Sequence, residues 1–235
     1  MRFENIRNTR LDKWAGKLTS LIPGIKGLKP FAEMFYWRLK KWEEKEFSNH
    51  HYEYFFTTYF GLEKEFYSNK KILDIGCGPR GSLEWANNTI EKYGLDPLAH
   101  KYQKMNGEKH KMIYVTGVSE AMPFENACFD LVSSFNSLDH VDNLDKSIEE
   151  ITRVLKPGAL FLLIADIHEK ATITEPSAFS WNIMEKFSND FELLSETHFE
   201  GHQLYKSIRK GVPFNHGDPT KRYGILTACL KKKAP

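Results

Sequence analysis

The sequence predicts a doubly wound α/β fold, in which a mostly parallel, seven-stranded sheet follows a cap of helices. From Lys71 onward, short apolar segments alternate with amphipathic segments, as expected of parallel strands joined by helices. Residues 1–70 are instead rich in aromatic and charged side chains and show no strand alternation. We therefore divide the chain into a helical N-terminal cap or lid, residues 1–70, and a sheet domain, residues 71–235.

Two helices are predicted in the cap, at residues 31–45 and 51–66. The first places apolar side chains near one helical face: Phe31, Met34, Phe35, Leu39 and Trp42. The second is rich in aromatic side chains and is interrupted near Gly61. We expect these aromatic side chains to pack on the sheet and to cover the mouth of the binding site.

Seven strands are predicted in the sheet domain, at residues 71–75, 92–95, 112–116, 129–134, 159–165, 191–199 and 223–230. Helices are predicted between them at residues 82–89, 98–105, 144–154 and 178–187. In the segment 144–154 apolar residues recur at helical spacing, and Lys156-Pro157-Gly158 follows as a stop signal. Residues 201–222 are too many for a tight hairpin between the last two strands.

The composition is that of an ordinary globular protein, and the net charge of +2 gives no reason to expect nucleic-acid binding across the whole surface. The charge is uneven, because residues 1–46 hold eleven Lys and Arg against six acids. This basic, aromatic segment is compatible with weak contact to an anionic membrane surface. The N-terminus is polar, and no apolar run approaches the roughly 20 residues that span a bilayer. A cytoplasmic location is expected.

Cysteine and histidine usage gives no metal or disulfide signal. The three cysteines, Cys77, Cys128 and Cys229, are far apart and form no C-x-x-C pair. His50 and His51 are adjacent, so they cannot both face one metal ion from a helix. No metal site is expected.

The most informative segment is Ile72-Leu73-Asp74-Ile75-Gly76-Cys77-Gly78-Pro79-Arg80-Gly81. Its apolar start suits a strand buried on both faces, and its glycines allow a sharp turn that approaches a ligand closely. Asp74 can accept hydrogen bonds at the strand end. The segment predicts a nucleoside-type cofactor at the carboxyl end of the first strand. The alternatives are a structural turn without a ligand and a nicotinamide dinucleotide site, because the glycines also satisfy G-x-G-x-x-G.

Asp96 ends the second predicted strand, about 20 residues after the glycine turn. An acid at this place can accept hydrogen bonds from both hydroxyls of a ribose. The alternative is a simple Asp-Pro turn formed with Pro97.

Three further segments follow in order: Thr116 to Phe124, Phe129 to Val141, and Arg153 to Leu160. Together with the glycine turn, they resemble class I S-adenosylmethionine-dependent methyltransferases over about residues 71–165. The closest branch includes quinone-biosynthesis and other small-molecule methyltransferases. The resemblance implies a Rossmann-like fold and S-adenosyl-L-methionine as the cofactor.

The resemblance also implies roles for individual residues. Asp74, Gly76 and Gly78 match the motif that holds the amino-acid half of the cofactor, and Asp96 matches the acid that binds the ribose. Asn136, after the fourth strand, lies where the family lines the methionine and the sulfonium.

Ser119 and Glu120 lie where the family contacts adenine. The chain departs from the family pattern just before them, since Val118 replaces the acid that often receives the adenine amino group. Loss of one net hydrogen bond is expected to cost roughly 1 kcal/mol of cofactor affinity.

A general base is needed only if the methyl acceptor must lose a proton of high pKa, because methyl transfer depends mainly on alignment. Ligands in such sheets bind beyond the carboxyl ends of the strands. The candidates there are His140 after the fourth strand, and Asp166 and His168 after the fifth. In the family, a histidine at the position of His140 is commonly structural.

The sequence therefore predicts S-adenosylmethionine-dependent methyl transfer to a small-molecule acceptor, with an oxygen nucleophile of glycan or secondary-metabolite type preferred. One alternative is a tRNA or protein methyltransferase, although no Asn-Pro-Pro-Tyr-type motif follows the fourth strand and no separate nucleic-acid module is recognisable. The other is a non-catalytic relative that binds the nucleoside.

Overall fold

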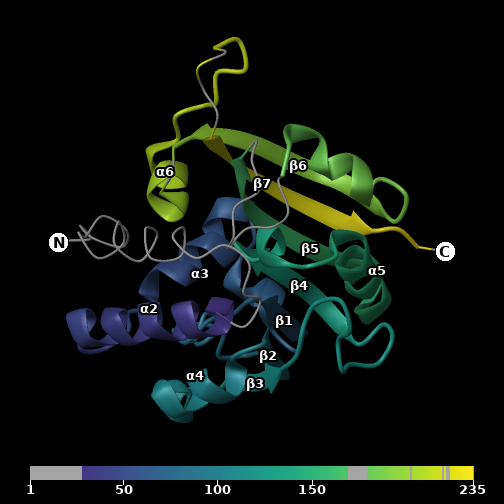
Figure 1. The fold of residues 1–235 in the computed structure, drawn as a ribbon. Coiled ribbons are helices and arrows are strands. Elements are labelled where there is room, and N and C mark those ends of the chain that lie inside the picture. The colour runs from purple at the N-terminus through teal and green to yellow at the C-terminus, as the bar shows by residue number, and fades with distance from the viewer. Residues whose placement is uncertain (1–27, 169–178, 202, 219, 221–222, 235) are drawn as a thin grey trace.

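The computed structural model describes residues 28–168, 179–201, 203–218, 220 and 223–234. Within them, seven strands form one sheet in the order β3-β2-β1-β4-β5-β7-β6 (Figure 1). Strands β1 to β5 run parallel, whereas β7 is antiparallel to both of its neighbours, β5 and β6. The predicted mostly parallel, seven-stranded sheet is confirmed.

The strands lie close to the predicted segments. Their bounds are Lys71–Ile75 (β1), Glu91–Asp96 (β2), Ile113–Thr116 (β3), Phe129–Phe135 (β4), Leu155–His168 (β5), Phe191–Glu200 (β6) and Tyr223–Lys232 (β7). The largest difference is in β5, which was expected at residues 159–165. It is longer at both ends because Leu155 already pairs with Phe129 of β4, and His168 still pairs with Tyr223 of β7.

The described helices are Leu28–Glu44 (α2), His50–Phe56 (α3), Ala99–Met105 (α4), Leu144–Val154 (α5) and Leu204–Lys210 (α6). Short 3-10 segments cover Thr58–Phe60, Lys64–Tyr67, Gly107–Lys109, Leu138–His140 and Trp181–Phe187. Helix α5 begins at a side-chain cap, because Asn143 Oδ1 accepts a hydrogen bond from the Lys146 backbone at 3.0 Å. None of the described helices combines the length and the apolar character that a membrane span requires.

The helix predicted at residues 82–89 is wrong, since this segment forms turns. The buried Lys92 ammonium contacts this segment. It donates to the backbone carbonyls of Leu83 and Ala86, both at 3.1 Å. The Leu83 carbonyl also accepts a hydrogen bond from the Ala86 backbone at 3.1 Å, which is the three-residue spacing of a turn and not the four-residue spacing of an α-helix. The turns are therefore bonded both within the segment and to the side chain of a neighbouring strand.

Two other predicted helices also differ. The helix at residues 51–66 ends at Phe56, and Gly61, with a φ angle of +69°, separates the two 3-10 segments that follow. The helix at residues 178–187 is a 3-10 segment at Trp181–Phe187. Both regions keep their expected position in the chain order but not their expected regularity.

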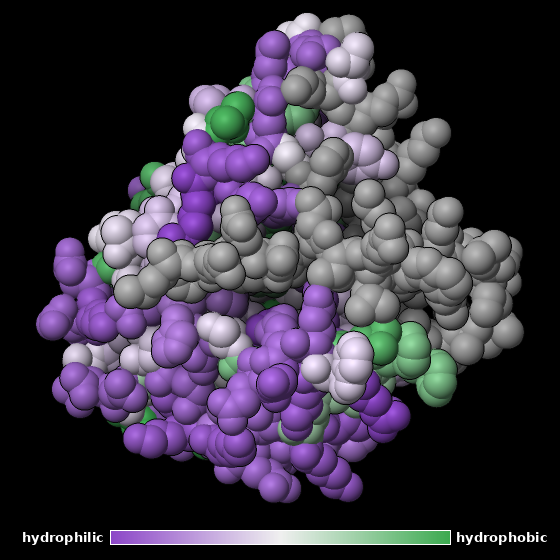
Figure 2. All heavy atoms as spheres, turned by 90° about the vertical axis from the view of Figure 1, so that its left-hand side faces the viewer, coloured by the Kyte–Doolittle hydropathy of each residue, from purple (hydrophilic) through white to green (hydrophobic). Residues whose placement is uncertain are grey.

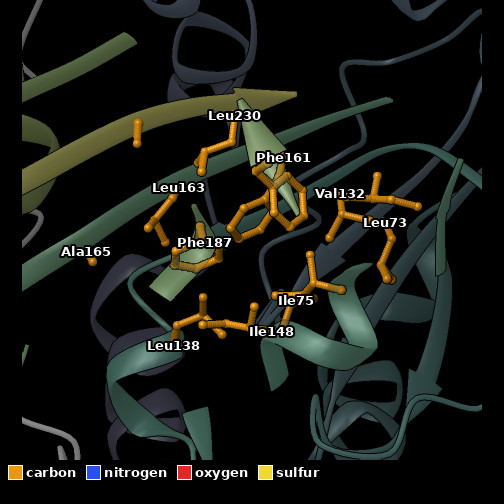
Figure 3. Packing of buried hydrophobic residues seen from close by; sticks show 14 of the residues in the cluster. Leu73, Ile75, Val132, Leu138, Ile148, Phe161, Leu163, Ala165, Phe187 and Leu230 are labelled. Carbon is orange, nitrogen blue, oxygen red and sulfur yellow. The ribbon is translucent and has the colours of Figure 1, made fainter. Parts of the chain in front are cut away.

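Strand alternation divides the core between the two faces of the sheet. On one face, Leu73 and Phe161 pack in a cluster with Ile148 of α5 (Figure 3). On the other face, Ile72 packs in a cluster with Phe56 of α3. Part of the cap therefore shares a hydrophobic core with the sheet.

Helices α2 and α4 lie side by side at the edge of the sheet formed by β2 and β3 (Figure 1). The Tyr102 hydroxyl donates to Glu33 Oε1 at 2.6 Å, and the Trp37 ring meets the Tyr102 ring edge-on. The face of the molecule on this side is mostly hydrophilic (Figure 2).

Candidate cofactor-binding site

The carboxyl ends of β1, β2 and β4 meet where the order of the strands reverses. β1 lies between β2 and β4 in the sheet, although the chain reaches β4 only after β2 and β3. In open α/β sheets, such a switch point leaves a crevice outside the strand ends in which ligands bind. The residues that follow these three strands therefore define the candidate site.

The glycine turn brings bare backbone to this edge. Gly76 and Gly78 have φ angles of +71° and +56°, a left-handed conformation that glycine adopts without strain. A Cβ atom at Gly76 would overlap the side chain of Ser137, which follows β4. Ser137 Oγ also donates to the Ile75 carbonyl at 2.7 Å. The turn is thus packed tightly against the end of β4.

Asp74 lies at the base of the turn and is only 4% exposed. Its carboxylate accepts hydrogen bonds from Ser133 Oγ of β4, at 2.6 Å, and from Ser82 Oγ. Burial raises the pKa of Asp74 to about 6, while the two hydroxyl groups oppose the shift. These contacts join β1, β4 and the segment after the turn, so Asp74 fixes the shape of the glycine turn.

Asp96 lies at the end of β2, directly beside the turn. Its Oδ2 accepts a hydrogen bond from the Gly78 backbone at 3.4 Å, and its Oδ1 accepts one from the Leu98 backbone at 2.8 Å. Burial raises the pKa of Asp96 to about 7, and Glu33 of α2 contributes to the shift. A carboxylate has about four acceptor sites, so these two bonds leave capacity for hydroxyl donors.

Asn136 follows β4 on the other side of the turn. It is a non-glycine residue with a φ angle of +58°, and such conformations are enriched at functional sites. Its Oδ1 atom is buried and has no hydrogen-bond partner in the described part of the chain. A buried carbonyl oxygen without a donor is costly, so Asn136 is a candidate acceptor for a hydrogen bond from a ligand or a water molecule.

Ser119 and Glu120 lie in the loop after β3. The Gly117 backbone N–H donates to the Asp96 carbonyl at 3.3 Å, which places this loop beside the end of β2. Their side chains, however, face α5. Ser119 Oγ lies 2.8 Å from Ser147 Oγ, and Glu120 Oε1 accepts from the backbone of Asp142 at 2.8 Å. The assignment of both residues to adenine stays a prediction.

The three candidate bases lie at the adjacent carboxyl ends of β4 and β5. His140 ends the 3-10 segment after β4, and its Nε2 is 3.8 Å from the carboxylate of the fully buried Asp139. Asp166 and His168 belong to the last part of β5, where they pair with Ile225 and Tyr223. Strand alternation puts Asp166 on the same face of the sheet as Asp74. Their catalytic roles stay predictions.

The sequence did not reveal that α2 lies against the glycine turn. The Trp37 ring lies 3.4 Å from the position of a Cβ atom on Gly78. Arg80, which is 6% exposed, forms two hydrogen bonds of 2.7 Å to the carboxylate of Glu44. Arg80 also lies over the Trp37 ring. The residues in these contacts are far apart in the chain, so no local pattern could have linked them.

A second group missed by the sequence comes from α3 and α6. The His51 ring lies 4.2 Å from the Tyr52 ring and 5.1 Å from the Tyr205 ring, measured between centroids. Burial lowers the pKa of His51 to about 4, and the nearby charge of Arg80 adds to this effect. This histidine is therefore neutral near pH 7. The group forms an aromatic wall near Arg80 and the glycine turn.

The residues at these strand ends fit a nucleoside cofactor that carries an amino-acid tail. Asp96 offers acceptors to ribose hydroxyls, the turn at Gly76 and Gly78 offers backbone without side chains, and Asn136 offers a buried acceptor. Within the described residues, no group of three or more His, Cys, Asp or Glu side chains has the arrangement of a metal site.

Comparisons with known proteins agree with this interpretation. Residues 73–163 match the family model described as a methyltransferase domain. Tocopherol O-methyltransferase of Arabidopsis thaliana is 26% identical over 144 residues, covering 56% of this chain and 40% of that protein. Demethylmenaquinone methyltransferase of Leptospira interrogans is 32% identical over 111 residues, covering 43% of this chain and 45% of that protein.

Among solved structures, phosphoethanolamine N-methyltransferase 2 of Haemonchus contortus, in complex with S-adenosyl-L-methionine, has a TM-score of 0.55. The match covers 79% of this chain and 56% of that chain at 17% identity, so it shows similarity of fold. The chain spans 36–42% of the length of three curated relatives that it matches.

Proposed function

We propose that the whole protein transfers the methyl group of S-adenosylmethionine to a small-molecule acceptor, through the methyltransferase domain that residues 73–163 match. The observation that carries this proposal is the pairing of two features at neighbouring strand ends. Buried Asp96, at the end of β2, accepts a hydrogen bond from the backbone of Gly78 in the glycine turn, and Asn136, directly after β4, has a buried carbonyl oxygen without a hydrogen-bond partner among the described residues.

In this proposal, S-adenosylmethionine supplies an activated methyl group on its sulfonium, so the main task of the protein is alignment. Asp96 accepts hydrogen bonds from the ribose hydroxyls. The backbone at Gly76 and Gly78 admits the amino-acid half, and Asn136 supplies an acceptor near it. Asp74 holds the turn in shape through its bonds to Ser133 and Ser82.

For the acceptor, we propose an oxygen nucleophile on a small molecule of glycan or secondary-metabolite type. The names of relatives cover transfer to oxygen, nitrogen and carbon, so the choice of oxygen goes beyond them. The aromatic wall of His51, Tyr52 and Tyr205 supports an organic acceptor, because aromatic rings bind apolar and planar groups well. Asp166, His140 and His168 are the proposed candidates for a general base.

We further propose that residues 1–70 act as a cap or lid on the domain formed by residues 71–235. Two contacts support this division of roles. Trp37 lies on Gly78, and Glu44 pairs with the buried Arg80 at the end of the glycine turn. Because these contacts hold α2 against the glycine turn, side chains of α2 would lie next to a cofactor bound there.

The assignment of Asp96 can be tested with the Asp96→Asn variant. We expect its affinity for S-adenosylmethionine to fall about tenfold or more, because hydrogen bonds to a charged group contribute about 1.5–3 kcal/mol. Isothermal titration calorimetry measures this directly. Asp130→Asn is the matched control, since Asp130 lies near the opposite end of β4, where it pairs with Lys156.

An unchanged affinity in Asp96→Asn would remove the ribose assignment. Methyl transfer is tested separately. The wild-type protein is incubated with S-adenosylmethionine and a panel of hydroxylated metabolites, and methylated products are detected by mass spectrometry. Tight binding without any methylated product would favour the non-catalytic alternative.

A further inference from the structure

The outer face of α2 exposes large aromatic side chains. Phe31, Phe35 and Trp42 are 68%, 46% and 79% exposed. Their spacing of four and seven residues places them in one stripe along the helix. The sequence pattern put these residues on one face together with Met34, but the structure separates them. Met34 is buried, so the inner face of α2 is distinct from the aromatic stripe.

The inner face of α2 is already occupied. Met34 and Trp37 cluster with Tyr102 of α4, and Glu33 accepts a hydrogen bond from the Tyr102 hydroxyl. These contacts hold the helix in one orientation, so the exposed stripe is not explained by a helix that packs poorly. Three large aromatic side chains on one side of a helix mark an interaction surface.

Cations surround the aromatic stripe. Arg38 lies within it and is exposed, and Lys45 follows the end of the helix. A shallow cavity between α2 and α4 is lined by further lysines: Lys41, Lys104 and Lys109.

Three acids also lie on this surface. Glu43 pairs with Lys40 at 3.1 Å, Glu46 lies 3.6 Å from Lys109, and Glu108 lines the same cavity. The cations listed above outnumber them, and Figure 2 shows the hydrophilic character of this side of the molecule.

We propose that the outer face of α2 docks on an anionic lipid bilayer. Exposed aromatic side chains insert at the level of the headgroups, and neighbouring Lys and Arg are attracted to acidic lipids. The aliphatic parts of Arg38 and Lys45 extend the apolar contact while their charged ends stay in water.

Docking through α2 would also orient the candidate site. The inner face of the same helix lies against Gly78 and near Asp96, so only α2 would separate this part of the candidate site from the bilayer. This orientation has a use only if the proposed function holds, because it would give the enzyme access to acceptors that partition into membranes. The docking itself does not depend on methyl transfer.

The test uses the full chain and sedimentation with lipid vesicles. Vesicles of phosphatidylcholine alone are compared with vesicles that also contain phosphatidylglycerol, at low and high salt. We expect binding to the anionic vesicles that weakens as salt rises, because screening reduces the attraction. The Phe31→Ser/Phe35→Ser/Trp42→Ser variant should bind about tenfold or more weakly, since three apolar side chains are lost.

Two controls accompany this variant. Leu193→Ser/Leu194→Ser removes exposed apolar side chains from the edge strand β6 and should bind like the wild type. Arg38→Glu/Lys45→Glu should lose anionic-vesicle binding. Lys186→Glu/Lys231→Glu, with the same change of charge at the far end of the sheet, should lose much less. Circular dichroism and S-adenosylmethionine titration show whether each variant is folded.

Three results would overturn the proposal. The wild type does not bind anionic vesicles, or the triple variant binds as well as the wild type, or the aromatic stripe proves to be a dimer contact. Sedimentation equilibrium detects the last case as a wild-type dimer that the triple variant lacks. Vesicle binding without S-adenosylmethionine binding would instead reject the proposed function and leave the docking intact.

Discussion

At the scale of single residues, the candidate site depends on groups held in unfavourable states. Asp96 is buried with a raised pKa, Asn136 has a left-handed backbone and an unbonded carbonyl oxygen, and Gly76 turns where a side chain would collide. Strained or unsatisfied groups persist where function requires them. Their concentration at the ends of β1, β2 and β4 is the strongest residue-level argument for the site.

Gly76 and Gly61 form a matched pair for testing the tight turn. Both have φ angles near +70°, but a Cβ atom on Gly76 would overlap Ser137, whereas Gly61 has no atom within 4 Å of that position. We expect Gly61→Ala to lower the free energy of unfolding by about 1 kcal/mol from backbone strain alone. Gly76→Ala should lower it by about 3 kcal/mol or more, because the end of β4 must also move. Equal losses in urea unfolding would show that the turn is not packed against β4.

At the scale of elements, a buried ion pair adds to the contacts that hold α2. Arg80 and Glu44 have side-chain exposures of 7% and 22%, and two hydrogen bonds of 2.7 Å join them. The pair links the end of α2 to the segment after the glycine turn. Because of this ion pair, the position of α2 in the cap depends on the position of the glycine turn, where the cofactor would bind.

The Glu44→Gln variant tests the contribution of this ion pair to stability. It leaves a buried guanidinium without its charged partner, so we expect a loss of about 2–4 kcal/mol in the free energy of unfolding. The control is Glu53→Gln, which breaks an exposed ion pair with Lys64. In that pair the side chain of Lys64 is 57% exposed and that of Glu53 is 40% exposed. That change should cost less than about 1 kcal/mol. Similar losses in chemical denaturation would mean that the Arg80 pair does not anchor α2.

At the scale of the whole molecule, the buried acids make stability depend on pH. Burial raises the pKa of Asp74 to about 6 and that of Asp96 to about 7, whereas both groups return to about 4 on unfolding. The folded state therefore binds more protons than the unfolded state between about pH 4 and pH 7. The contribution of these groups to stability is present at low pH and is lost as pH rises through their folded pKa values.

For the cofactor-free protein, we expect this contribution to lower the thermal midpoint between pH 5 and pH 8. Asp96→Asn has no carboxyl group to ionise at that position, so its midpoint should fall less over the same interval. Differential scanning calorimetry at several pH values measures both slopes. Identical slopes for the two proteins would contradict the raised pKa of Asp96. The slope of an exposed-site variant, Asp142→Asn, provides the reference.

The sequence by itself determined the sheet domain and the positions of its candidate site residues. Apolar segments of strand length, and a glycine turn with an acid before it, are local patterns, because each depends on residues that are neighbours in the chain. The positions of the strands along the chain, the turn at Gly76 and Gly78, and the place of Asp96 at the end of the second strand followed from these patterns. The resemblance to a family extended them to Asn136.

The tertiary structure alone decided the features that join distant parts of the chain. Lys92 bonds the carbonyls of the turns that replace the predicted helix at residues 82–89, and Glu44 pairs with Arg80. Packing against α4 also separates the buried Met34 of α2 from the exposed Phe31, Phe35 and Trp42. Sequence spacing gives the period of a helix but not which face the rest of the molecule covers, because that depends on packing partners dozens of residues away.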